Sequence, residues 1–123
     1  MNKFTSGECN ILLCTDVASR GLDIPTVDVV INYDIPTNSW DYIHHVGRTA
    51  RAGRSGVAVS LVNQYELEWY IQMEKLVGKK LPEYPTEHEE VLQLEKRVSE
   101  ARRLAVLIIE LRKKKEMQKT GFL

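Results

Sequence analysis

The sequence lacks the features of exported and membrane-spanning proteins. No run approaches the ~18 consecutive apolar residues that a membrane helix needs. Its first six residues lack the apolar core of a signal peptide. The 123 residues carry no net charge, because 17 basic residues balance 17 acidic ones. We therefore expect an intracellular, soluble protein with no membrane partner, in which any nucleic-acid contact comes from local basic clusters.

Cysteine is also scarce. Cys9 and Cys14 are the only two cysteines, and neither metal-ligand spacing nor a catalytic signature surrounds them. The neighbouring His44 and His45 have too few further ligands nearby for a zinc site. The sequence therefore predicts two buried, reduced thiols and no bound metal.

Three short apolar segments, at residues 10–15, 27–33 and 57–62, predict strands. The first reads Ile-Leu-Leu-Cys, and the second is rich in β-branched residues, as expected for buried parallel strands. The stretches between them are long enough for crossover helices. This alternation predicts one α/β domain with a parallel sheet and a modest core.

Two helices are expected between and after these strands. The first covers residues 38–46, with Asn38 as N-cap and with Trp40, Ile43 and Gly47 on one face. The second follows a capping-box pattern from Asn63 to Glu66 and runs to Val77, where Gly78 would end it. The capping-box side chains and the terminal glycine are the usual start and stop signals of a helix.

A proline-containing linker at residues 79–85 precedes a long C-terminal helix. A second capping box, at residues 86–89, predicts where this helix begins, and we expect it to reach about Lys115. Its apolar residues step by three and four, as in a heptad seam. These residues are Val91, Leu94, Val98, Ala101, Ala105 and Ile108.

Charge is divided unevenly along this helical segment. Residues 86–100 hold five acids and two bases, whereas residues 101–123 hold seven bases and two acids. Acid at a helix start and base at its end suit the helix dipole, so helix stabilisation explains the pattern as well as binding does. For the basic cluster at residues 112–115, RNA contact, a localisation signal and a solvated helix end all remain open.

Two polar clusters follow predicted strands, which is where ligands of open α/β sheets bind. Residues 15–25 read Thr-Asp-Val-Ala-Ser-Arg-Gly-Leu-Asp-Ile-Pro, and taken alone they are compatible with an ordinary loop. In residues 44–56 an arginine recurs every third residue, at Arg48, Arg51 and Arg54, among three glycines. Guanidinium groups pair with phosphate oxygens, and glycine lets the backbone approach a ligand, so this cluster predicts an anion site.

Together the two clusters resemble conserved motifs V and VI of DEAD-box RNA helicases. The match to motif V covers residues 15–25, and that to motif VI covers residues 42–54. Residues 29–36 match the strand and turn between them, so the resemblance runs over about residues 4–81. It implies an incomplete RecA-like parallel sheet with flanking helices, followed by a long C-terminal helix. The domain boundaries expected from it are residues 1–81, a linker at 82–86 and a helical extension at 87–123.

The resemblance also implies roles for individual residues. Thr15 and Gly21 would bind RNA, and Asp23 would accept a hydrogen bond from the ATP ribose. Arg48 and Arg51 would reach the γ-phosphate across an interdomain cleft, with Arg51 as the catalytic arginine finger. His44 would couple the RNA and ATP contacts, and Arg20 would brace the cleft.

By the same resemblance, the cofactor is ATP with Mg²⁺, bound mainly by the first RecA-like domain. The partners would be RNA, that first domain and pre-ribosomal proteins. Residues 63–82 look most like the subgroup that acts in ribosomal RNA processing, which implies a location in the nucleus and nucleolus.

The sequence departs from the family in two respects. His45 stands where the family has arginine in motif VI, and a phosphate or interdomain contact there would be weaker. The 123 residues contain neither a P-loop nor an Asp-Glu-Ala-Asp box, so we expect no ATP hydrolysis by this chain alone. The chain is expected to begin partway through the second domain and, with an exposed sheet edge, to be marginally stable. A non-catalytic module that binds RNA or a partner, and a truncated remnant, are the alternatives.

Overall fold

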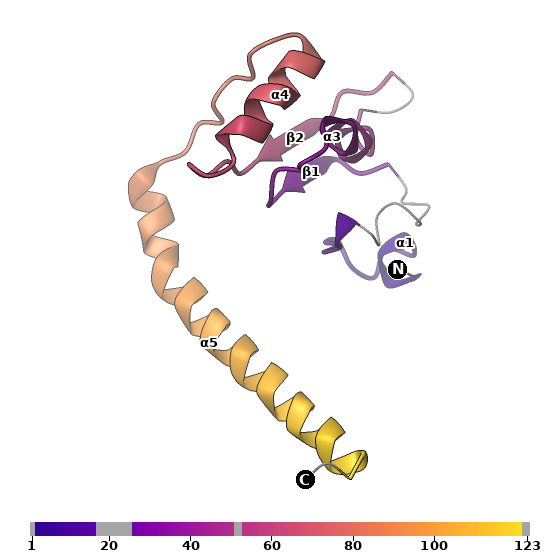
Figure 1. The fold of residues 1–123 in the computed structure, drawn as a ribbon, viewed down its shortest axis with the longest axis vertical. Coiled ribbons are helices and arrows are strands. Elements are labelled where there is room, and N and C mark those ends of the chain that lie inside the picture. The colour runs from indigo at the N-terminus through magenta and orange to yellow at the C-terminus, as the bar shows by residue number, and fades with distance from the viewer. Residues whose placement is uncertain (1, 17–25, 51–52, 122–123) are drawn as a thin grey trace. The chain divides into compact units, whose positions relative to one another are not determined.

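The structure, a computed structural model, describes residues 2–16, 26–50 and 53–121. Its elements are α1 (Asn2–Thr5), β1 (Val29–Asn32), α3 (Ser39–Val46), β2 (Val57–Ser60), α4 (Leu67–Val77) and α5 (His88–Lys119) (Figure 1). The chain divides into two compact units, residues 1–82 and residues 83–123. Within the described ranges, no helix has the length and apolarity to cross a membrane.

The first unit is built on two parallel strands. Val29 lies opposite Val57, and Asn32 lies opposite Ser60. The β-branched residues of both strands favour this extended backbone, and α3 lies in the connection between them. The predicted α/β class, with a parallel sheet, flanking helices and a long C-terminal helix, is confirmed.

A small apolar core joins the two helices of this unit. Ile35, Tyr42 and Met73 are 4%, 6% and 1% exposed. Half-buried side chains complete the cluster, namely Val46, Tyr70, Val77 and Leu81. Burial raises the pKa of Tyr42 above its ordinary value. The core-facing side of α3 therefore carries Tyr42 and Val46, whereas Trp40 and Ile43, on the face marked by the sequence pattern, are exposed.

Both predicted helices of this unit form, with one shifted start. The Asn38 side chain caps α3 by accepting a hydrogen bond from the Trp40 N–H at 2.9 Å. At residues 63–66 the Glu66 carboxylate accepts from the Asn63 N–H at 3.0 Å, but α4 begins only at Leu67. The buried Glu66 also accepts from the Ile35 N–H at 3.2 Å. Its carboxylate therefore joins the turn before α4 to the turn after β1.

The end of α4 is held by a second carboxylate. Gly78, in the left-handed conformation with φ 80°, ends the helix as predicted. Oε1 of Glu74 accepts hydrogen bonds from the Tyr70 hydroxyl at 2.5 Å and from the Leu81 N–H at 3.0 Å. The Tyr70 hydrogen bond is the main reason that the pKa of Glu74 is lowered, and the same bond raises the pKa of Tyr70.

Two predictions for the N-terminal segment are wrong. Residues 10–15 form no strand, and Ile11 and Leu13 are 78% and 91% exposed. Cys9 and Cys14 are free but exposed, not buried. An apolar run becomes a buried strand only when a neighbouring strand accepts its backbone hydrogen bonds, and β1 pairs only with β2 in the described sheet.

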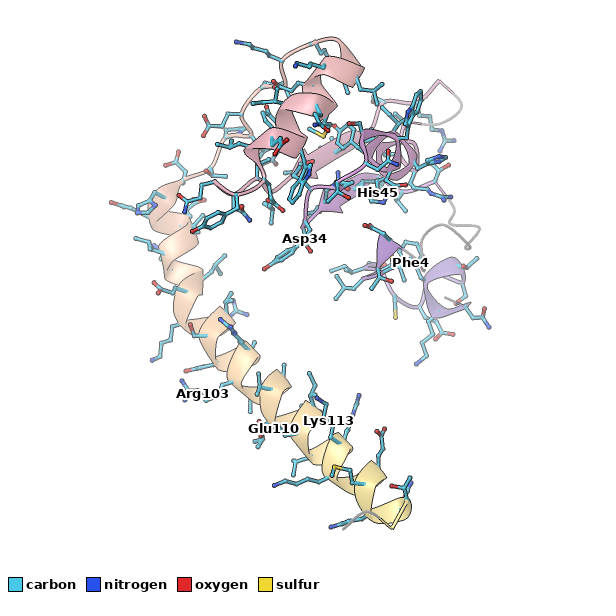
Figure 2. All side chains as sticks on the ribbon, viewed as in Figure 1. Phe4, Asp34, His45, Arg103, Glu110 and Lys113 are labelled. Atoms are coloured by element: carbon cyan, nitrogen blue, oxygen red, sulfur yellow. The ribbon has the colours of Figure 1, made fainter. Side chains whose placement is uncertain are left out.

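The second unit is dominated by α5, a single helix of 32 residues with no buried residue. The predicted capping box before it does not form, since the N-cap is Glu87 and no side chain caps the helix. The helix also extends past Lys115 to Lys119. Figure 2 shows side chains projecting from the whole length of α5, among them Arg103, Glu110 and Lys113.

Candidate functional site

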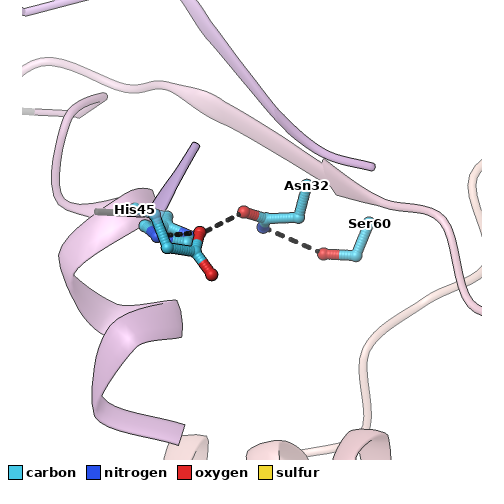
Figure 3. Close-up of polar contacts among 4 residues, drawn as sticks. Asn32, His45 and Ser60 are labelled. Atoms are coloured by element: carbon cyan, nitrogen blue, oxygen red, sulfur yellow. Dashed lines mark hydrogen bonds and ion pairs between the residues drawn. The ribbon is translucent and has the colours of Figure 1, made fainter. Parts of the chain in front are cut away.

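A chain of polar contacts links three elements of the first unit. Asn32, the last residue of β1, is 5% exposed and lies between a strand and a helix. Its Nδ2 donates to Ser60 Oγ on β2 at 3.1 Å, and its Oδ1 lies 3.0 Å from His45 Nδ1 on α3 (Figure 3). The other ring nitrogen of His45, Nε2, lies 3.3 Å from Asp16 Oδ1.

These contacts determine which ring nitrogens of His45 must carry a proton to donate a hydrogen bond to both neighbours. Asn32 Oδ1 and the Asp16 carboxylate are both acceptors, so with Asn32 in this orientation each ring nitrogen faces an acceptor. Neutral imidazole carries one N–H, whereas imidazolium carries two. Only the protonated ring donates to both partners at once. His45 on α3 therefore contacts Asp16, the residue after Thr15, although the two residues are 29 positions apart in the sequence.

The loop after α3 is fastened to the start of β1. The Arg48 carbonyl accepts from the Val27 N–H at 2.9 Å. Thr49, only 4% exposed, donates from its hydroxyl to the Asp28 carbonyl at 3.1 Å. That carbonyl also accepts from the Val57 N–H at 3.3 Å. Together these bonds fix the backbone that carries Arg48.

Close packing explains one glycine of this loop, and backbone conformation makes Ala50 unusual. A Cβ on Gly56 would collide with the Thr49 side chain and the Ala50 backbone. Ala50 is the one non-glycine residue with positive φ in the described chain, at 56°. A side chain in this left-handed conformation costs free energy that glycine would avoid.

A cavity of about 950 Å³ lies beside this network. His44, His45 and Arg48 contribute polar groups from α3 and the loop after it. Residues 10–14, Phe4 and the β1 side chains supply a largely apolar wall, together with the carboxylates of Asp28 and Asp41. The lining therefore combines one guanidinium group, which can pair with a phosphate, with two acidic residues that would repel it.

The structure accounts for only part of the predicted site. His44 is exposed and Arg48 is half-buried, and the two lie on the same cavity. Thr15 is exposed and directly precedes Asp16, the partner of His45. Arg20, Gly21, Asp23 and Arg51 lie outside the described residues. In the described part of the chain, no group of three or more His, Cys, Asp or Glu residues could hold a metal ion.

Among the expected ATP ligands, Arg48 is the one that the structure describes. Its carbonyl accepts the Val27 hydrogen bond, and the residue lies among those that line the cavity. Of the expected ATP ligands, Asp23 and Arg51 are not described, so the donor set visible here is compatible with a phosphate group but incomplete.

The sequence pattern did not single out Asn32, Ser60 or Thr49, and it marked Glu66 only as part of a capping box. All four are polar, and Asn32, Thr49 and Glu66 are buried. An asparagine that ends a Val-Val-Ile run is the one visible signal. It indicates a polar contact at the end of a strand but does not name the partner.

Comparisons with known proteins agree on one family. Residues 1–53 match the family described as the helicase conserved C-terminal domain. The chain is 78% identical over 107 residues to the DEAD-box ATP-dependent RNA helicase 10 of Arabidopsis thaliana, covering 87% of this chain and 24% of that protein. It is 65% identical over 105 residues to the ATP-dependent rRNA helicase RRP3 of Gibberella zeae, covering 85% of this chain and 22% of that protein.

Solved structures give the same result. The chain is similar to S. cerevisiae Dbp5 bound to RNA and ADP BeF3, with a TM-score of 0.62 and 38% identity, over 79% of this chain and 27% of that chain. The chain thus spans about a quarter of the length of these three proteins.

Proposed function

Because this chain carries part of the helicase C-terminal domain of the DEAD-box RNA helicases, we propose that it supplies one side of a joint ATP and RNA site. The other side would be a first RecA-like domain, which would bring the P-loop and hold most of the ATP and Mg²⁺. In this proposal Arg48 and Arg51 bind the γ-phosphate and Asp23 binds the ribose. Thr15 and Gly21 bind the RNA backbone.

One observation carries this proposal. His45, from the motif VI segment, lies 3.3 Å from Asp16, in the motif V segment beside Thr15. The segment proposed to hold RNA therefore touches the helix that precedes Arg48. A helicase needs such a connection, because RNA binding must alter the ATP contacts. His44 and Arg20 are proposed to assist this coupling at the cleft.

The chemistry proposed for Arg51 is electrostatic. Charge accumulates on the phosphate oxygens during phosphoryl transfer, and a guanidinium placed beside them stabilises that charge. Arg48 would bind the same phosphate before and during transfer. Neither residue supplies a nucleophile, so the residues of this chain assist hydrolysis but do not perform it without a first domain.

Ribosomal RNA is the proposed substrate class. The Gibberella zeae relative is named an rRNA helicase and is 65% identical over 105 residues. A nucleolar location and pre-ribosomal partners would follow from that substrate. The phosphate and ribose contacts assigned here carry little sequence preference, so they do not identify a particular RNA.

The proposal is tested in a chimeric enzyme. This chain replaces the segment of the Arabidopsis relative to which it is 78% identical, and RNA-stimulated ATP hydrolysis is measured. Arg51→Ala is expected to lower the rate by roughly 10³-fold, the scale of an arginine finger. Arg54→Ala is the matched control, since Arg54 lies three residues away and is exposed. Equal effects of the two variants would contradict the assignment.

A non-catalytic binding module is the second candidate, favoured by the exposed helix α5. It predicts that the 123-residue chain alone binds single-stranded RNA or a protein partner and melts cooperatively. RNA binding that is unchanged by Thr15→Val would count against the RNA site proposed above.

A further inference from the structure

The helix α5 has more apolar surface than an isolated helix can keep in water. Between Leu104 and Leu111 all residues except Glu110 are apolar, and the large ones are 49–60% exposed. A helix that is apolar on all sides is normally covered by another element. Toward the N-terminal end of α5, the large apolar residues other than Leu92 lie on the heptad seam that begins at Val91.

We propose that α5 binds α5 of a second copy of this chain in an antiparallel coiled coil. The inference does not depend on the proposed helicase function. It rests on the sizes of the seam residues and on the charges beside them.

Residue sizes along the seam favour the antiparallel orientation. When the two seams are aligned about their common centre, Leu94 lies opposite Ala105 of the other copy, Val98 opposite Ala101, and Val91 opposite Ile108. Each alanine therefore meets a larger side chain, and the layers interdigitate. In a parallel pair in register, Ala101 and Ala105 would each face themselves and leave two adjacent layers underfilled.

Charges beside the seam favour the same orientation. In the antiparallel pair Glu95 flanks Arg102 of the other copy. A parallel pair would instead place Glu90 beside Glu95 and Arg97 beside Arg102. Opposite charges at flanking positions select coiled-coil partners, and like charges there disfavour the alternative.

The positions facing away from the seam agree with this arrangement. Arg103 and Glu110, which project from α5 in Figure 2, occupy the outermost heptad position. They would remain in water in the dimer. The result is a symmetric interface, formed twice by the same surface, as in most two-chain assemblies.

Sedimentation of the full chain over roughly 2 to 200 µM tests the association. A concentration-dependent dimer is expected. Leu94→Gln should abolish it, whereas Leu92→Gln should leave it intact, because Leu92 lies outside the seam. The two leucines are a matched pair, 51% and 49% exposed. A monomer at all concentrations would overturn the proposal. Equal behaviour of the two variants would also overturn it, because the chains would then associate through another surface or not at all.

Disulfide trapping tests the orientation. In a background with Cys9→Ser and Cys14→Ser, Leu94→Cys and Ala105→Cys are made as separate proteins. Crosslinks are expected only in the mixture, because residues 94 and 105 are about 16 Å apart along one helix. Crosslinks of either protein with itself would indicate a parallel pair and overturn the proposal. Circular dichroism of each variant verifies that the helix is retained.

Discussion

In residues 1–82, Ile35, Tyr42 and Met73 are almost fully buried, whereas in α5 no residue is buried. The first unit is held together by contacts between residues distant in sequence, including the polar bonds of Asn32 and Glu66. The second unit is held by hydrogen bonds within one helix. The difference indicates that the first unit folds around its own small core, while α5 requires another surface to cover its apolar residues.

The two tryptophans make this comparison measurable. Trp40 and Trp69 both lie in the first unit, and the second unit has none. Tryptophan fluorescence therefore follows the unfolding of residues 1–82. Far-ultraviolet circular dichroism is dominated by the 32 residues of α5.

The largest effect is expected from Met73→Ala. Met73 is 1% exposed, and removing a buried side chain of this size costs about 2–5 kcal/mol. This loss is enough to unfold a marginally stable unit. Fluorescence-detected urea unfolding should shift strongly, while the dichroism of α5 persists. Leu107→Ala, at a site 51% exposed on α5, is the control and should leave the fluorescence transition unchanged. Equal shifts for both variants would contradict the conclusion that the first unit folds around its own core, independently of α5.

A smaller gain is expected from Ala50→Gly. Relief of the positive φ at residue 50 should exceed the entropic cost of glycine and stabilise the first unit by about 0.5–1 kcal/mol. Ala58→Gly in β2 is the matched control and should destabilise the unit by about the same amount. Both changes are measured by the same fluorescence transition. A loss of stability in both variants would show that the backbone at residue 50 is not strained.

The smallest effect concerns pH. Folding lowers the pKa of Glu74 below its ordinary 4.5, so the ionised form is the one stabilised in the folded state. Its contribution is fully present above pH 4.5 and disappears as the pH falls through the lowered pKa. The first unit should therefore lose stability in acid, and Glu74→Gln should flatten that part of the profile. An unchanged acid profile in Glu74→Gln would assign the loss to other carboxylates.

The sequence predicted the regular elements well where local signals sufficed. As expected, Asn38 caps the start of α3 and Gly78 ends α4. The strands predicted at residues 27–33 and 57–62 also formed, as β1 and β2. The prediction of a strand at residues 10–15 was wrong because strand pairing depends on a neighbouring strand. An apolar pattern does not indicate whether such a neighbour is present. The helix predicted to start after Asn63 begins only at Leu67, and the sequence did not indicate that Glu66 also accepts a hydrogen bond from Ile35, 31 residues away.

The candidate site was predictable only through motif resemblance. Loop composition indicated an anion site around Arg48 but not its partner. His45 was expected to weaken a phosphate or interdomain contact, and in the structure its two ring nitrogens lie beside Asn32 and Asp16. Contacts of this kind join segments far apart in sequence, so no local pattern could predict them.

Asp16 and His45 are proposed to connect the segment assigned to RNA with the segment assigned to ATP. RNA affinity of the chimeric enzyme, measured with and without a non-hydrolysable ATP analogue, tests this connection most directly. Asp16→Ala and His45→Ala should each reduce the increase in RNA affinity that the analogue causes, and the double variant should reduce it no further, because the two residues act through one contact. Additive losses, or an undiminished effect of the analogue in both single variants, would contradict the account.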